Sequence, residues 1–115
     1  MSAIFGLYHL QHDSIDPAQG PKLMEALQHY PADRVLSWQE RDVFLGCHAQ
    51  WITPESVGET VPFYDTERGL AITSDAIIDN RVELFESLQV PKSDQLSIPD
   101  SLLILLAYEK WGKEA

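Results

Sequence analysis

The chain has 115 residues, of which 44% are hydrophobic and 23% charged, a composition typical of one ordinary globular domain. Its 18 acidic and 8 basic residues give a formal net charge of −10, which repels nucleic-acid backbones and anionic membrane surfaces. We therefore expect neither nucleic acid nor membrane as a partner. Cys47 is the single cysteine, so an intrachain disulfide framework and a multi-thiolate metal site are excluded. The N-terminus lacks the basic and apolar regions of a signal peptide, which indicates a cytoplasmic protein.

The first third of the chain predicts a strand followed by a short helix. Residues 3–10 are apolar and aromatic without a charge, the pattern of a strand buried on both faces. After a polar loop, an amphipathic helix is predicted, with an apolar face formed by Leu23, Leu27 and Tyr30. Pro31 is expected to end this helix.

The middle of the chain predicts a β-hairpin and a further strand. Residues 34–39 and 43–52 read as two strands joined by the polar turn at 40–42, which is hairpin spacing. Residues 65–69 form a second polar turn ending in glycine, and a strand is predicted over residues 70–74. Antiparallel pairing is the expected arrangement for strands with such short connections.

Two helices are predicted in the last third. One spans residues 80–88, and the other begins at Asp100, which can cap it, and runs to about Trp111. Residues 102–108 are apolar around nearly the whole helical circumference, which predicts burial on more than one side. Such a helix needs a cover, which we expect from a partner chain or from a longer parent protein.

The remaining aromatic and sulfur-bearing residues are expected to be structural. The tryptophans Trp38, Trp51 and Trp111 are spread through the predicted elements, as core residues are. Cys47 and His48 are adjacent, but neighbouring side chains of a strand point to opposite faces and cannot form a catalytic dyad. Cys47 is more simply a small buried residue.

Four stretches of the chain stand in a recognisable order: residues 1–6 (MSAIFG), 45–50 (LGCHAQ), 71–84, and 99–105 (PDSLLIL). Together they resemble the class II glutamine amidotransferases, and most of all the glutaminase part of asparagine synthetase and its relatives in lasso-peptide biosynthesis. The resemblance implies an α+β fold, the N-terminal part of an αββα sandwich of the N-terminal-nucleophile (Ntn) hydrolase type, with an antiparallel sheet and flanking helices.

The resemblance also implies a domain organisation. Residues 1–115 correspond to a single, partial glutaminase-like domain, and the synthetase domain with its pyrophosphate-binding loop is absent from this sequence. No cofactor is therefore expected in this segment, because ATP and magnesium are implied only for the absent synthetase domain.

The family's nucleophile is an N-terminal cysteine whose own α-amine serves as the base. The matching residue here is Ser2. Removal of Met1 would leave a free α-amine beside a hydroxyl, so a serine nucleophile is chemically feasible. A hydroxyl is far less ionised at neutral pH than a thiol, which weakens this nucleophile.

The family's substrate-binding positions are mostly altered. His48 matches the arginine that holds the glutamine carboxylate, and Asp75-Ala76 match the asparagine and glycine of the oxyanion hole. A carboxylate at Asp75 opposes the negative charge of a tetrahedral intermediate. Asp100 is retained and matches the aspartate that holds the α-amino group of glutamine. Its alternative role is the N-cap of the last helix.

Three hypotheses follow. The first is a degenerate, inactive glutaminase-like segment of an asparagine-synthetase-like protein that serves as a scaffold or docking region, with its own synthetase domain as partner. The second is an Ntn-type amidase that uses Ser2 on a non-glutamine, small-molecule amide, with His48 and Asp75 serving an amine-bearing or cationic ligand. The third is a self-associating module that forms a homo-oligomer through the exposed sheet edge and the last helix.

Overall fold

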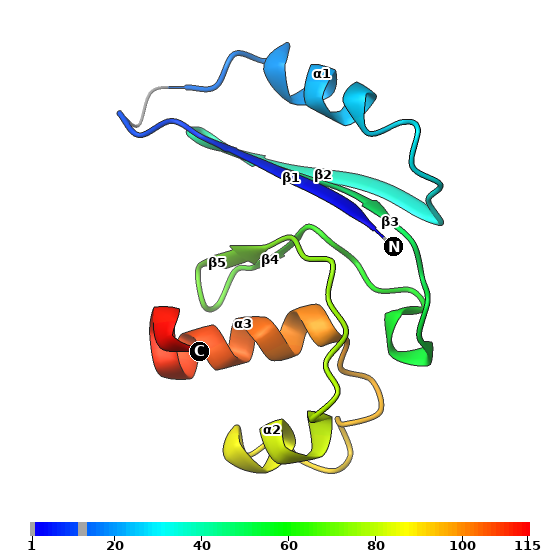
Figure 1. Ribbon diagram of the computed structural model, residues 1–115. Coiled ribbons are helices and arrows are strands. Elements are labelled where there is room, and N and C mark those ends of the chain that lie inside the picture. The colour runs from blue at the N-terminus through cyan, green and yellow to red at the C-terminus, as the bar shows by residue number, and fades with distance from the viewer. Residues whose placement is uncertain (1, 12–13) are drawn as a thin grey trace.

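The computed structural model describes residues 2–11 and 14–115, and its layers follow the order helix, sheet, sheet, helix (Figure 1). The two sheets are antiparallel, one of three strands in the order β1-β3-β2 and one of two strands, β4-β5. The strands are β1 (Ala3–Tyr8), β2 (Arg34–Glu40), β3 (Val43–Ala49), β4 (Phe63–Asp65) and β5 (Leu70–Ile72). The helices are α1 (Gln19–Ala26), α2 (Arg81–Ser87) and α3 (Asp100–Trp111), with short 3-10 turns at Pro54–Ser56 and Gly112–Glu114.

The predicted α+β class, the antiparallel strands and the flanking helices are therefore confirmed. The β2–β3 hairpin lies where the sequence predicts it, although β3 ends at Ala49 and not at the predicted residue 52. Strand β5 ends at Ile72, before the predicted residue 74, and α3 has the predicted bounds. No helix in the described part of the chain has the length and apolar character needed to cross a membrane.

Helix α1 covers the outer face of β1 and β3. The rings of Phe5 and Phe44 stack there, with centroids 5.4 Å apart. Two glycines allow this close approach, since an added methyl at Gly20 would overlap the Phe44 ring and one at Gly46 would overlap both Phe5 and the sulfur of Met24. Close helix–sheet contact is a common reason for glycine within such elements.

The predicted apolar face of this helix is wrong in detail. Leu23 and Tyr30 are largely exposed, and the helix ends at Ala26, before Pro31. The packed face is instead formed by Gly20 and Met24. The spacing of the apolar residues predicted that the larger side chains face the sheet. The space between α1 and β3 is instead narrow, and Gly20 lies at its centre.

The two-stranded sheet lies below β2 and β3. The Trp38 ring of β2 stacks on Tyr64 of β4, with centroids 5.0 Å apart. Thr73, directly after β5, donates a hydrogen bond to the carbonyl oxygen of Gly46 in β3 at 3.3 Å. The second sheet is thus offset and does not extend below β1. Ile4, on the inner face of β1, is 41% exposed, so the prediction of a first strand buried on both faces is wrong.

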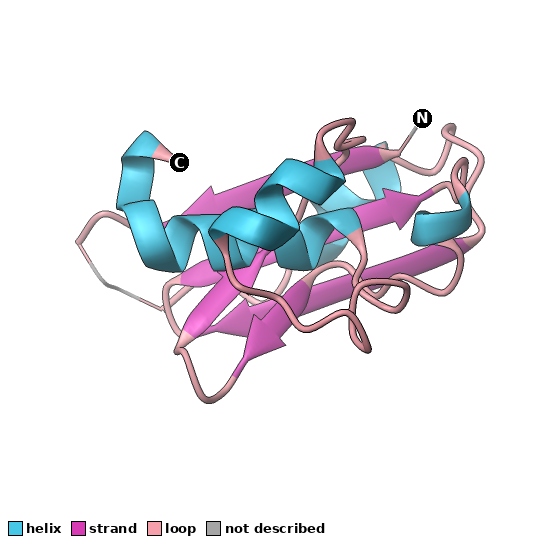
Figure 2. Cartoon of the chain, turned by 90° about the horizontal axis from the view of Figure 1, so that it is seen from below, coloured by secondary structure: helices cyan, strands magenta, loops and turns pink. Residues whose placement is uncertain are grey.

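Helix α3 is buried on two sides, as its apolar circumference predicts. Leu103 packs with Phe85 of α2 and with Ile98, while the opposite side of α3 contacts β5. Seen from below, α2 and α3 lie in front of the strands (Figure 2). The last turn is an exception, because Trp111 is 40% exposed and is not the core residue expected.

Arg68 joins the β4–β5 turn to α3. Its guanidinium donates to the carboxylate of Asp65 at 2.7 Å and also pairs with Glu109 of α3. The hydrogen bonds from Arg68 hold the pKa of Asp65 below its ordinary value. This turn is therefore anchored to the helix below it.

Candidate functional site

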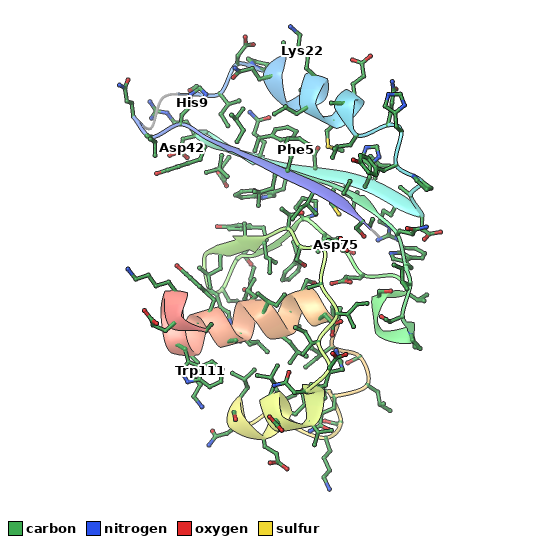
Figure 3. The ribbon with its side chains drawn as sticks, viewed as in Figure 1. Phe5, His9, Lys22, Asp42, Asp75 and Trp111 are labelled. Carbon is green, nitrogen blue, oxygen red and sulfur yellow. The ribbon has the colours of Figure 1, made fainter. Side chains whose placement is uncertain are left out.

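A pocket of about 310 Å³ lies where the start of β1, the chain after β3 and the chain after β5 meet. Its lining includes residues from all three segments: Ser2, Gln50, Trp51, Glu59, Asp75 and Ala76. Asp75 lies just below the three-stranded sheet in the segment that leaves β5 (Figure 3). The structure thus brings together the predicted site residues Ser2, Asp75 and Ala76, although 73 positions separate Ser2 from Asp75.

Ser2 is held by hydrogen bonds on both its backbone and its side chain. Its backbone nitrogen donates to Oδ1 of Asp75 at 3.2 Å. Its Oγ accepts the backbone N–H of Gln50 at 2.9 Å and lies 3.5 Å from the carbonyl oxygen of the same residue, to which it donates. The hydroxyl therefore continues the pairing of β1 with the chain beyond β3. The candidate nucleophile thus has a structural role.

The pocket is acidic. Asp75 and Glu59 both line it, and no lysine, arginine or histidine is among the described residues that do. Glu59 accepts the backbone N–H of Ser101, near the start of α3, at 3.0 Å, which fixes its carboxylate. Negative charge in a partly enclosed site favours cationic ligands and repels carboxylates.

Cys47 lies beside this pocket but is buried. It belongs to a small inner-face cluster with Ala49 and Val61. Burial, with smaller contributions from the charges of Asp75 and Glu59, raises the pKa of the thiol to about 11, although a hydrogen bond with Thr73 opposes the shift. A neutral, enclosed thiol is a poor nucleophile.

His48 does not reach the pocket. It is 7% exposed and pairs with Ala3 of β1 and Val35 of β2. Alternation along β3 places it on the outer face, toward α1, whereas Cys47 faces inward. The two neighbours therefore point apart, and the residue matched to the family's carboxylate-binding arginine lies on the other side of the sheet from Asp75.

Asp100 does not line the pocket either. It is 5% exposed, forms an ion pair with Arg81 and accepts the backbone N–H of Ile78 at 3.2 Å. The N-cap position of α3 belongs to Pro99, and Asp100 is the first helical residue. The alternative prediction of an N-cap is therefore wrong, because the carboxylate turns toward Arg81 instead of toward its own helix.

The sequence did not predict most of the other lining residues, and Gln50, Trp51 and Glu59 are the polar or aromatic ones that matter most here. The β1–β3 register points to Gln50, because continuing this pairing past Ala3 and His48 brings Ser2 to residues 49–50. Trp51 is also notable because its indole N–H is buried without a hydrogen-bond partner among the described residues. Glu59 lies in an irregular loop, so no periodic signal pointed to it.

Comparisons with protein-family models, with curated proteins and with solved structures give no match. In residues 2–11 and 14–115, no group of three or more histidine, cysteine or acidic side chains is placed to hold a metal ion.

Proposed function

We propose that the chain is a degenerate glutaminase-like domain, the N-terminal part of an Ntn-type αββα sandwich in an asparagine-synthetase-like protein, and that it serves as a scaffold or docking region. The layer order helix, sheet, sheet, helix supports this assignment together with the four sequence stretches. The main observation in favour of an inactive site is the hydrogen bond from the Ser2 nitrogen to Asp75.

The contact removes the base that an N-terminal nucleophile needs. With Met1 retained, the Ser2 nitrogen is an amide and cannot accept a proton. With Met1 removed, the nitrogen becomes an α-amine 3.2 Å from a carboxylate. A neighbouring negative charge attracts the protonated amine, which opposes the neutral form that a base requires.

The surroundings of Ser2 also disfavour the next step of amide hydrolysis, which is formation of the tetrahedral intermediate. An acyl-transfer intermediate needs hydrogen-bond donors around its oxyanion, and loss of one such donor costs about 2.7 to 4 kcal/mol. Ala76 retains a backbone N–H at the pocket, but Asp75 contributes an acceptor in place of a donor. Glutamine's α-carboxylate would also meet Asp75 and Glu59, and the described lining residues include no basic side chain to balance them.

A glutamine hydrolysis assay tests this proposal. Purified protein, its Ser2→Ala variant and buffer are each incubated with L-glutamine, and released glutamate is measured. We expect all three to give the same amount. Hydrolysis by the native chain that disappears in Ser2→Ala would overturn the proposal.

The acidity of the pocket favours one second candidate, an amidase that uses Ser2 on an amine-bearing amide. Asp75 and Glu59 would then bind the substrate's ammonium group. Intact-protein mass spectrometry separates the two candidates, because retained Met1 blocks the α-amine and eliminates the amidase. If Met1 is removed, hydrolysis of lysinamide that is lost in Ser2→Ala would support the second candidate.

A further inference from the structure

A hollow of about 270 Å³ lies at the start of α3, beside the Ser2 pocket, and shares Glu59 with it. One side is formed by residues 57–60 and Phe63, and the other by Ser97, Pro99, Ser101 and Leu102. Figure 1 shows the start of α3 facing the loop that contains the 3-10 turn, and the hydrogen bond from Ser101 to Glu59 joins the two. We name this space the Ser101 hollow.

Ser101 has a buried hydroxyl that no residue in the described part of the chain hydrogen-bonds. Ser101 is 2% exposed and lines the hollow. Its backbone N–H donates to Oε1 of Glu59 at 3.0 Å, whereas its Oγ has no such partner. The large majority of buried polar side-chain atoms are hydrogen-bonded. This hydroxyl is therefore available to a molecule in the hollow.

Glu59 places a negative charge beside that hydroxyl. Its carboxylate is partly buried, and the Ser101 N–H holds one of its oxygens. Among residues 2–11 and 14–115, no basic side chain forms an ion pair with it. Arg34 contacts only Thr60 at the rim, by a hydrogen bond of 3.1 Å. A partly buried charge without a counter-ion is unfavourable, so a cation in the hollow would be stabilised and an anion repelled.

The helix dipole of α3 does not reverse this preference. A helix N-terminus carries roughly half a positive charge, which by itself favours anions. Glu59 brings a full negative charge to the same place, where it accepts the N–H of Ser101. The charge of Asp100 is balanced by Arg81. The sum at the start of α3 is therefore negative, like the formal charge of −10 on the whole chain.

The rest of the wall suits a carbon chain. Phe63 and Leu102 are partly buried there, and Val57 is 66% exposed. An ammonium group has three N–H donors and no acceptor. The carboxylate of Glu59 and the Oγ of Ser101 are acceptors that such a group could reach together, because the Ser101 N–H joins the two residues.

We propose that the Ser101 hollow binds a small primary amine with an apolar body, whose ammonium group donates hydrogen bonds to Glu59 and to the Oγ of Ser101. Binding is non-covalent, and no bond is broken. This inference goes beyond the proposed function and does not depend on it, because neither Ser2 nor Asp75 lines the hollow.

Probes that share one carbon chain test the chemistry. Hexylamine, hexan-1-ol and hexanoate differ only at the head group. Each is added at pH 7 to the nitrogen-15-labelled full chain, and the amide signals of Gly58 and Ser101 are followed by NMR. We expect saturable binding of hexylamine in the millimolar range, and binding at least about tenfold weaker for the alcohol and the carboxylate.

A further probe identifies the source of the amine. Acetyl-lysine methylamide presents the same ammonium group on a peptide side chain. Binding of hexylamine alone would support a free amine as the ligand, and binding of both probes would support a lysine side chain of a partner protein. Either result agrees with recognition of a primary ammonium group.

Protein variants locate the bound amine. Ser101→Ala removes the hydroxyl, and Glu59→Gln removes the charge but keeps an oxygen for the Ser101 N–H. Each should weaken hexylamine binding by about tenfold. Glu83→Gln, at an exposed position of α2, is the charge-matched control, and Asp75→Asn removes a carboxylate of the Ser2 pocket that does not line the hollow. Both should leave the affinity nearly unchanged, and urea denaturation checks that all four variants are folded.

Several outcomes would overturn the proposal. They are absence of hexylamine binding, equal binding of hexanol or hexanoate, and an unchanged affinity in Ser101→Ala. A loss in Asp75→Asn as large as that in Glu59→Gln would place the amine in the Ser2 pocket and would also overturn it. None of these results measures glutamate release, so failure of this inference is distinguishable from failure of the proposed function.

Discussion

The backbone nitrogen of Ser2 donates a hydrogen bond to Oδ1 of Asp75 at 3.2 Å, although 73 positions separate the two residues. This contact ties the start of β1 to the chain that leaves β5, and so it connects the two sheets at one end. It also places a carboxylate at the atom that an N-terminal nucleophile would use as its base. The same contact that supports the fold therefore opposes the chemistry.

Replacement of Ser2 by alanine should lower stability modestly. The Oγ of Ser2 accepts the N–H of Gln50 at 2.9 Å, and loss of such a hydrogen bond reduces the free energy of unfolding by about 0.5 to 1.5 kcal/mol. Urea denaturation measures this difference. Ser37→Ala, at an exposed position of β2, is the control and should change stability by less than about 0.5 kcal/mol. Equal effects of the two changes would contradict a structural role for Ser2.

Removal of the Asp100 side chain should be strongly destabilising. Its ion pair with Arg81 is mostly buried, with side-chain exposures of 7% and 15%. Asp100→Ala leaves the guanidinium buried without its partner, which reduces the free energy of unfolding by about 3 to 5 kcal/mol. Thermal and urea denaturation report the change.

Glu109→Ala is the matched control for Asp100→Ala. It also breaks an ion pair, with Arg68, but the two side chains are 50% and 34% exposed. Exposed pairs contribute at most about 1 kcal/mol. If both variants lost the same stability, the buried Arg81–Asp100 pair would not be a main anchor of α3.

Stability should fall between about pH 9 and pH 11 because of Cys47. The thiol pKa is about 11 in the folded chain against an ordinary 9.0, so in this range the folded state keeps a proton that the unfolded state releases. The unfolded state then binds fewer protons, and the free energy of unfolding decreases as pH rises. Below pH 9 this effect is absent.

Cys47→Ala isolates that contribution from other groups that titrate at alkaline pH. Urea denaturation of both proteins at pH 8 and pH 10.5 should show a larger loss for the native chain than for the variant. Parallel losses would contradict the burial of Cys47. The native thiol should also resist alkylation at pH 8 and react only after unfolding.

Gly46→Ala should disturb the contact between α1 and the sheet. Its methyl group would overlap the Phe5 ring and the sulfur of Met24, and overpacking of this kind costs about 1 to 3 kcal/mol. Gly6→Ala is the control, since its methyl would meet only the flexible Leu45 side chain at 3.2 Å and a backbone oxygen at 3.9 Å. A smaller loss of stability for Gly46→Ala than for Gly6→Ala would contradict the described packing.

The order and type of most elements were predictable from the sequence because they depend on local periodicity. The hairpin of β2 and β3 and the apolar circumference of α3 are examples. Strand β4 was not predicted, because three residues are too few to show a period. The exposed inner face of β1 was not predictable, because it depends on the offset of the second sheet. Composition cannot reveal how one sheet is positioned over another.

The candidate site was predictable only in part, for a related reason. Ser2, Asp75 and Ala76 were named and do meet in one pocket, but His48 lies on the outer face of β3. A shift of one residue along a strand reverses the face to which a side chain points. A match based on sequence order alone does not detect such a shift. The observed strand register does, because it shows on which face each side chain lies.

The proposal that the Ser2 pocket does not hydrolyse glutamine is tested most directly by release of glutamate from L-glutamine by the purified chain, compared with Ser2→Ala in the same assay. We expect identical glutamate for the two proteins, at the level of the buffer blank. Glutamate formation by the native chain that is abolished in Ser2→Ala would contradict it.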